Sequence, residues 1–415
     1  MKRPVGKTLL WVLACASILL LIYEAVTLIG SVVRPLLANP QALQTDFHYY
    51  YDAAVRFSAR PAQLYNLDDD VIAGFAYPPP AILPFLWLSG WPLGTAFLAF
   101  TIASYLVVFV ALQQWIGFLK RHGFSLDRGT TIALMLIALA LGPTYMNAIF
   151  GQVNGFVLAA AVAFVSLAPT ATLEAALLLA LGTWLKVYPI ILAAIGLWDR
   201  RTWRALAWAI VAAIAIALVV VPFVPPSNFG TFFFDVLPSR LDKTAIHISN
   251  QSLVAFIERF RYPSQQFLNW TGEQAITATV AVRVLNLVAA GAAILVLWRG
   301  ARDDVRSQAV TAATLMALIA VIAPLGWGHT YMMVLPLVML QLLAMREARP
   351  LVAIAIFGCV LALMIPAGRR FAFVEGAPDA LLNLIHSRYL LATLVLAAIP
   401  SIPGQSTVST AVAST

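Results

Sequence analysis

Residues 8–30 read TLLWVLACASILLLIYEAVTLIG. The run contains one charged residue, Glu24, and it has the length of about 20 residues that a helix needs to cross a hydrocarbon core of roughly 30 Å. It is too long for the apolar part of a signal peptide, and no small-residue cleavage motif follows it. We therefore expect a retained first transmembrane helix, which places this chain among the membrane proteins.

The composition of the 415-residue chain extends this conclusion: 61% of its residues are hydrophobic, 11% are charged, and the mean hydropathy is +0.88. Soluble domains carry about 25% charged residues, so this chain needs lipid as its solvent. The formal net charge of +8 comes from short basic clusters between apolar runs. This is the pattern of cytoplasmic loops rather than of a nucleic-acid-binding face, so we expect membrane lipid and no nucleic acid as a partner.

The apolar runs predict an all-α polytopic protein with about twelve transmembrane helices. The expected spans lie near residues 8–30, 92–119, 130–149, 152–168, 172–185, 187–198, 203–224, 275–299, 308–323, 329–345, 349–366 and 387–400. Prolines at 78–80 and 84 make residues 77–90 an extra re-entrant or interfacial piece. We expect one integral membrane domain over residues 1–400, and a disordered cytoplasmic tail at 401–415.

The dense basic clusters in the short loops predict a cytoplasmic N-terminus in a multi-pass plasma (inner) membrane protein. The polar motifs then fall at the outer ends of spans: GQVNG (151–155), KVYP (186–189), SNQS (249–252) and PLGWGH (324–329). The longer outer loops, 31–78 and 225–274, would cover a site that opens to the periplasm or exterior. Arg283, inside a predicted span, should face protein rather than lipid.

Asp46 opens the first polar segment, TDFHYYYDAAVRF (45–57). A carboxylate close to the low-dielectric boundary can accept a proton from an attacking hydroxyl group. The alternative is local, because Thr45 or Asp46 could simply cap a helix over residues 47–59. Tyr50 in the same segment could stack on a sugar ring or anchor the chain at the lipid headgroups.

Lys186 stands between two apolar stretches, LLLALGTWL and VYPIILAAIGLW. An ammonium there is costly unless it faces a cavity or an anion, and a lipid-linked phosphate is a suitable anion. The alternative is that the side chain reaches the outer headgroups. His329, next to Trp327, could contact a phosphate or a sugar hydroxyl, and the amides Gln152, Asn154, Asn250 and Gln251 are suited to reading hydroxyl groups.

The sequence contains no Walker loop, GxGxxG turn, HExxH or CxxC motif. We therefore expect neither a nucleotide cofactor nor a metal. Cys15 and Cys359 lie within apolar runs and are interpreted as buried hydrophobic residues.

The order of the motifs resembles glycosyltransferase family 87, a family of polytopic GT-C enzymes that includes polyprenyl-phosphate-mannose-dependent α-1,2-mannosyltransferases. The matching motifs are D-F-x-x-Y-Y-x-A from Asp46, L-Y at 64–65, Y-P-P from Tyr77, G-Q-x-N, K-x-Y-P, N-Q-S and P-x-x-W-x-H. The chain lacks the adjacent second acid of some other GT-C enzymes, and Gly328 precedes the histidine.

The resemblance implies a hexosyltransferase with an outward-facing cavity, a polyprenyl-phosphate sugar donor, and a glycolipid or glycan acceptor. Asp46 would be the general base of an inverting reaction, and Lys186 and His329 would bind the donor phosphate. The sugar sites would be lined by Tyr50, Tyr77, Gln152, Asn154, Tyr188, Asn250, Gln251 and Trp327.

Two other functions remain open at this point. A transporter or flippase of lipid-linked glycans should show internal repeats and polar groups that reach both faces of the membrane. An O-antigen-ligase-like transferase would depend on arginine and histidine in one outer loop, where this chain has Arg240, His247 and Arg259.

Overall fold

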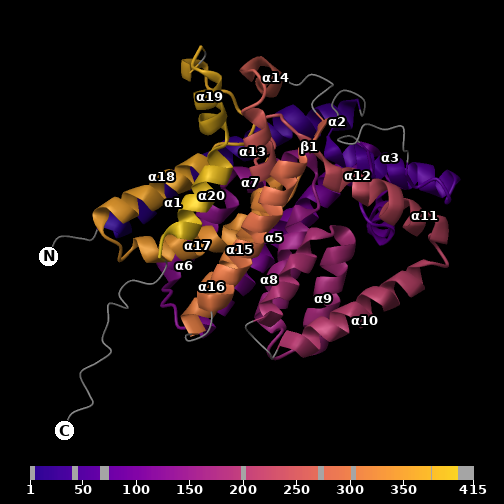
Figure 1. The fold of residues 1–415 in the computed structure, drawn as a ribbon, viewed down its shortest axis with the longest axis horizontal. Coiled ribbons are helices and arrows are strands. Elements are labelled where there is room, and N and C mark those ends of the chain that lie inside the picture. The colour runs from indigo at the N-terminus through magenta and orange to yellow at the C-terminus, as the bar shows by residue number, and fades with distance from the viewer. Residues whose placement is uncertain are drawn as a thin grey trace, which may run out of the picture.

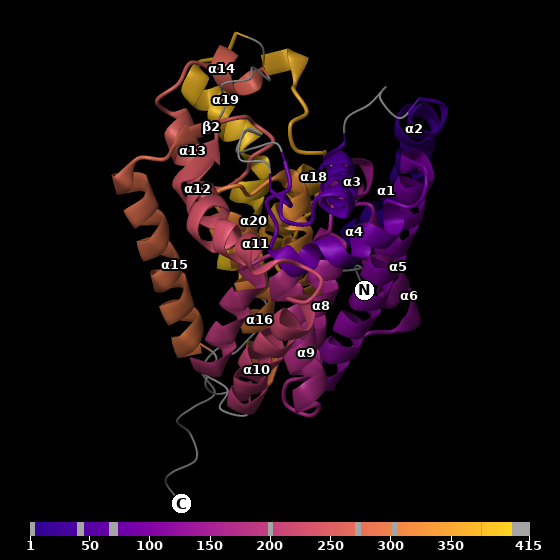
Figure 2. The same ribbon diagram turned by 90° about the vertical axis from the view of Figure 1, so that its right-hand side faces the viewer.

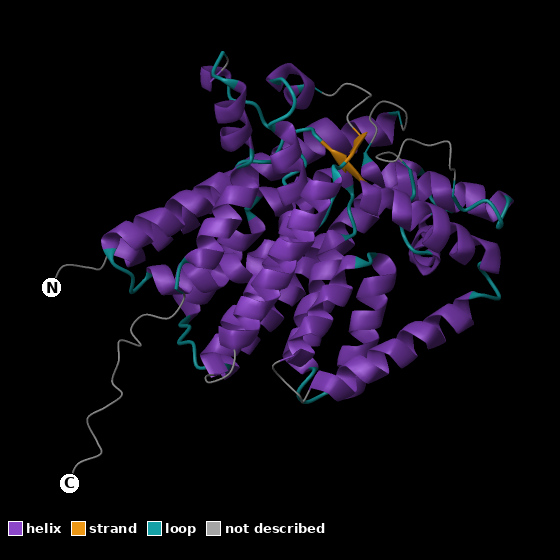
Figure 3. Ribbon diagram, viewed as in Figure 1, coloured by secondary structure: helices purple, strands orange, loops and turns teal. Residues whose placement is uncertain are grey.

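The computed structural model describes residues 5–39, 45–65, 74–197, 202–269, 275–300, 305–374 and 376–400. The predicted tail at 401–415 lies outside the described residues, as do parts of the two predicted cover loops. Helices make up most of the described chain (Figures 1 and 3).

The helices of the first half run from α1 to α10. They are α1 (Val5–Leu28), the π-helix η1 (Ile29–Val33), α2 (Arg34–Ala38), α3 (Asp46–Ala59), the 3-10 helix η2 (Pro79–Ile82), α4 (Leu83–Leu88), α5 (Leu93–Arg121), α6 (Arg128–Leu139), α7 (Gly142–Phe150), α8 (Asn154–Leu167), α9 (Thr172–Leu185), the 3-10 helix η3 (Tyr188–Leu197) and α10 (Trp203–Val220).

The second half starts with short elements and returns to long helices. Its elements are α11 (Pro226–Thr231), the π-helix η5 (Phe232–Val236), α12 (Leu237–Asp242), β1 (Lys243–Ala245), α13 (Leu253–Arg259), α14 (Ser264–Leu268), β2 (Ala275–Thr277), α15 (Val280–Gly300), α16 (Val305–Ile322), the 3-10 helix η6 (Gly328–Val334), α17 (Leu335–Met345), α18 (Pro350–Met364), the 3-10 helix η7 (Ala372–Val374), α19 (Asp379–His386) and α20 (Arg388–Ala398). β1 and β2 form one antiparallel pair, with Thr244 opposite Ile276.

The chain is an all-α polytopic membrane protein, and the predicted spans fall on one helix or on two consecutive ones, except that the span at 275–299 begins in β2 and becomes helical only from Val280. Among the described residues, six helices are long and apolar enough to cross a membrane, and two bent pairs raise this number to eight. Five further apolar helices are shorter, at 10–17 residues. The count of twelve spans therefore stays a prediction.

Burial separates the core of the bundle from its lipid-facing rim. The span that contains α17 is 100% buried, whereas those of α10 and α15 are only 17% buried. Because α10 and α15 expose large apolar side chains, lipid is their natural solvent. Figure 2 shows α15 at the edge of the molecule, where it packs mainly on α16 and α13.

The elements of the predicted outer side gather at one end of the bundle. In both views α3, α13, α14 and α19 lie at the upper end, and the C-terminal end of α15 lies at the opposite end (Figures 1 and 2). At the upper end several apolar helices are interrupted rather than continuous: α6 and α7 meet at 49°, and η6 precedes α17. Such breaks are tolerated at membrane depth where they are buried in protein or line a cavity.

Candidate active site

The start of α3 leaves the Asp46 side chain free for other contacts. Thr45 occupies the N-cap position, and its backbone N–H donates to His48 Nδ1 at 3.0 Å. Asp46 is the first residue of the helix. The capping alternative therefore applies to Thr45, and the carboxylate of Asp46 points to other parts of the chain.

The turn between α7 and α8 holds the two amides of the GQVNG motif. Gly151 ends α7 with φ of 63°, a left-handed conformation that favours glycine. A Cβ on Gly151 would lie 2.7 Å from Cβ of Phe47. The turn therefore packs directly on α3, and this contact brings Gln152 beside Asp46.

A cavity of about 970 Å³ opens at this end of the protein. Eight of the predicted site residues line it: Asp46, Tyr50, Tyr77, Gln152, Lys186, Tyr188, Trp327 and His329. Asn154, Asn250 and Gln251 are not among its lining residues. The structure thus places the acid and the lysine, 140 residues apart in sequence, on the wall of one cavity.

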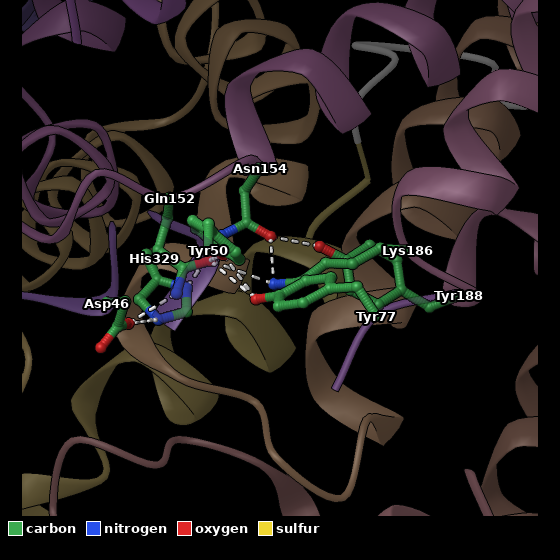
Figure 4. Close-up of polar contacts among 8 residues, drawn as sticks. All are labelled: Asp46, Tyr50, Tyr77, Gln152, Asn154, Lys186, Tyr188 and His329. Carbon is green, nitrogen blue, oxygen red and sulfur yellow. Dashed lines mark hydrogen bonds and ion pairs between the residues drawn. The ribbon is translucent and has the colours of Figure 1, made fainter. Parts of the chain in front are cut away.

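Asp46 is held through one of its two carboxylate oxygens (Figure 4). Gln152 Nε2 donates to Oδ2 at 2.5 Å, and His329 Nε2 lies 3.5 Å from the same oxygen. The Asp46 side chain is 32% exposed, whereas that of His329 is 4% exposed. The carboxylate can therefore meet a substrate, while the histidine behind it is enclosed.

Lys186 lies on the other side of the same cluster (Figure 4). It follows α9, outside the candidate spans, and its ammonium donates to Asn154 Oδ1 at 2.9 Å and to Gln152 Oε1 at 3.5 Å. The ammonium also lies 5.4 Å from the ring centre of Tyr77 and 5.5 Å from that of Tyr188. Burial lowers the pKa of Lys186 to about 7, although the charge of Asp46 opposes this effect.

Two tyrosine hydroxyls complete the polar cluster. The hydroxyl of Tyr50 lies 2.6 Å from that of Tyr77 and 2.8 Å from Gln152 Oε1. The ring of Tyr50 is stacked on Phe85 at 4.6 Å and is 1% exposed. Its ring is therefore free neither to stack on a sugar nor to anchor in lipid, and only its hydroxyl takes part in the polar cluster. Burial raises the pKa of both phenols, so they remain neutral hydrogen-bonding groups.

The structure corrects the prediction that Asn250 and Gln251 line a sugar site. Both side chains are fully buried and satisfy backbone groups: Asn250 Nδ2 donates to the Ala245 carbonyl, and Gln251 Nε2 to the His386 carbonyl. The backbone of this segment also pairs with the segment before His329, since Asn250 forms a β-bridge with Trp327. These amides therefore support the site rather than face its cavity.

Asn154 also lies outside the cavity wall and is 0% exposed. Its Oδ1 accepts hydrogen bonds from Lys186 and from the Tyr188 hydroxyl, and its Nδ2 lies 2.8 Å from His329 Nδ1. This amide was predicted to read a sugar hydroxyl. Its amide oxygen and nitrogen instead form hydrogen bonds with other residues of the site.

The cavity is also lined by basic residues that were not predicted to bind the donor. Arg240 in α12 and Arg283 in α15 line it, together with His247. Arg283 forms an ion pair with Asp242, so the expectation that Arg283 faces protein is confirmed. Arg283 could have been predicted to line the cavity, because it is a single basic residue within an apolar span. Nothing in the sequence distinguishes Arg240 from a surface arginine.

The comparison with known protein families assigns the chain to one family. Residues 75–282, half of the chain, match the family described as glycosyltransferase family 87. The matched region contains Gln152, Asn154 and Lys186, while Asp46 and His329 lie on either side of it. No curated protein matches the chain.

Proposed function

Because the chain belongs to glycosyltransferase family 87, we propose that this glycosyltransferase moves a sugar, most simply mannose, from a polyprenyl phosphate to a glycolipid or glycan acceptor. The reaction would take place at the outer face of the plasma membrane. The observation that carries the proposal is the pairing of Asp46 and Lys186 on one cavity wall, where Gln152 contacts both.

In this proposal Asp46 is the general base. Its carboxylate takes the proton of the acceptor hydroxyl as that oxygen attacks the anomeric carbon, and the bond from the sugar to the phosphate breaks. Asp46 is the one carboxylate among the described lining residues. A retaining double displacement needs a second group as nucleophile, so a single displacement with inversion fits this wall better.

Lys186 stabilises the departing phosphate. Charge that develops on a leaving group is stabilised most by donors already in place, and the ammonium of Lys186 is held by Asn154 and Gln152. Arg240 lines the same cavity and adds positive charge. With the cation on one side and the carboxylate on the other, the sugar would bind between them in one orientation.

The remaining wall of the cavity supports a lipid-linked donor. Much of it is apolar and comes from η3, α15 and α16, through Ile190, Ile191, Leu287, Ala290, Ile319 and Ile322. Such a wall lets a hydrocarbon chain stay out of water, where each exposed CH₂ group would cost roughly 0.8 kcal/mol. A soluble nucleotide sugar would make no use of it.

The test supplies the purified protein in lipid nanodiscs with polyprenyl-phosphate mannose, glucose or arabinofuranose, each with a panel of glycolipid acceptors. We expect one donor to be consumed and a product whose anomeric configuration is inverted, as read by NMR. Movement of intact lipid-linked glycan across vesicles without a new glycosidic bond would favour a flippase. A product of retained configuration would contradict the role of Asp46.

A further inference from the structure

Both ring nitrogens of His329 are engaged within the protein. Nδ1 lies 2.8 Å from Asn154 Nδ2, and Nε2 lies 3.5 Å from Asp46 Oδ2 (Figure 4). The side chain is buried. A histidine enclosed in this way has little to offer a phosphate, which was its predicted ligand, so its neighbours must explain its place in the site.

The direction of each hydrogen bond follows from Lys186. In its charged form, which predominates below pH 7, Lys186 can only donate, so the atom of Asn154 that it contacts at 2.9 Å must be the carbonyl oxygen. The NH₂ group of Asn154 then faces His329. Because this group can only donate, Nδ1 of the ring must be the acceptor and cannot carry a hydrogen.

The ring proton of neutral His329 must therefore sit on Nε2, which is the nitrogen that faces Asp46. At 3.5 Å the contact with Oδ2 is longer than an ordinary N–H···O hydrogen bond. Catalytic hydrogen bonds are often long in the absence of substrate and tighten in the complex. Gln152 already donates to the same oxygen at 2.5 Å.

We propose that Asn154 is a positioning residue, which holds His329 in its Nε2–H form so that this hydrogen points at Oδ2 of Asp46. Two N–H donors, from Gln152 and His329, then fix one carboxylate oxygen. The other oxygen, Oδ1, is left to receive the proton of the acceptor hydroxyl. The catalytic consequence rests on the proposed role of Asp46, whereas the protonation pattern of His329 does not.

The first test reads that pattern directly by nitrogen NMR on the full chain, with its five histidines nitrogen-labelled. The resonances of His329 are those that vanish in His329→Gln. We expect an unprotonated Nδ1 and a protonated Nε2 without any substrate. The near-isosteric Asn154→Asp places an acceptor at Nδ1, so that nitrogen should become protonated.

Asn228→Asp is the matched control, because Asn228 is a buried asparagine outside the cavity. Its substitution should leave the His329 resonances unchanged. A protonated Nδ1 in the unmodified protein, or no response of the ring to Asn154→Asp, would overturn the proposal even if the enzyme transfers sugar.

The second test uses turnover and separates positioning from phosphate binding. The amide of His329→Gln can place an N–H near the position of Nε2, and that of His329→Asn near Nδ1. We expect His329→Gln to keep at least about tenfold more kcat than His329→Asn, with donor KM unchanged in both. Equal losses of kcat, or a rise in donor KM alone, would contradict a positioning role.

Discussion

At Lys186 the buried ammonium meets two amide oxygens and two aromatic rings. We predict that Lys186→Met raises donor KM by roughly 10- to 100-fold, because a hydrogen bond to a charged group contributes about 1.5–3 kcal/mol. Acceptor KM should change much less. Lys120→Met, at an exposed lysine of α5, is the control. Equal changes in the KM values for donor and acceptor would show that Lys186 does not bind the donor phosphate.

The lowered pKa of Lys186, about 7, predicts a pH dependence of donor binding. Below pH 7 the amine is protonated and pairs with the phosphate; above it the neutral form predominates. Donor affinity should therefore fall as pH rises from 6 to 9, by up to about tenfold for each pH unit above 7. Donor titrations at several pH values measure this fall. A flat profile would mean that the ammonium does not meet the anion.

The place of a single residue in the cavity could be predicted where a charged side chain stands beside apolar sequence. Asp46 and Lys186 are charges beside apolar runs, and the structure places both on the cavity wall. Tyr50 was open between sugar stacking and lipid anchoring, and neither holds, because its ring stacks on Phe85, which lies 35 residues away in the predicted re-entrant piece 77–90. The contact of Asn154 with His329 depends on rotamers, which no residue pattern specifies.

Among the elements, the turn between α7 and α8 is the one that sets the distance from Gln152 to α3. We predict that Gly151→Ala costs about 1–3 kcal/mol of stability from its left-handed backbone alone. The added Cβ would also press on Phe47, next to Asp46, so kcat should fall as well. Thermal unfolding and turnover together measure both effects.

Gly230→Ala is the control for this variant, since nothing lies within 4 Å of the new Cβ and its φ is not positive. It should keep the turnover of the unmodified protein and unfold at the same or a slightly higher temperature, because alanine favours a helix such as α11. If Gly151→Ala also behaves like the unmodified protein, the turn does not position the acid.

The apolar runs predicted where helices lie but not how they break. The expected span at 172–185 coincides with α9, whereas the one at 130–149 is two helices that meet at 49°. Gly142 and Pro143 mark that bend. Similarly, η6 is a 3-10 segment whose residues are all buried, and an irregular backbone at this depth is tolerated where protein surrounds it.

At the scale of the whole molecule, Arg259 ties the predicted outer loop 225–274 to the C-terminal helices. This fully buried side chain donates to Asn383 Oδ1 at 2.7 Å, to Ser387 Oγ at 2.8 Å and to the Asn250 carbonyl at 2.7 Å. We predict that Arg259→Lys destabilises the protein by about 1–3 kcal/mol, because a point charge cannot reach all of these acceptors.

Thermal unfolding in detergent measures this loss. Arg261→Lys, at a neighbouring and more exposed arginine, is its control. A wild-type unfolding temperature for Arg259→Lys would show that the fold does not depend on this network.

The convergence of distant motifs could be predicted from topology, but their individual partners could not. GQVNG, KVYP and PLGWGH were placed at the same ends of spans, and residues of all three motifs line one cavity. The same reasoning placed Asn250 and Gln251 in the cavity, although Asn250 Nδ2 donates to the Pro324 carbonyl and Gln251 Nε2 to the His386 carbonyl. A side-chain amide forms hydrogen bonds to the backbone and to a substrate with the same atoms, so only the folded structure shows which partner it has.

The central claim is that Asp46 removes the acceptor's proton in the cavity that holds the donor phosphate. The most direct measurement compares single-turnover transfer and donor binding in Asp46→Asn with those in Asp52→Asn, an exposed acid on the same helix. We predict that Asp46→Asn binds donor normally and loses at least about 100-fold in transfer rate, while Asp52→Asn is unaffected. Transfer by Asp46→Asn at the rate of the unmodified enzyme would contradict the account.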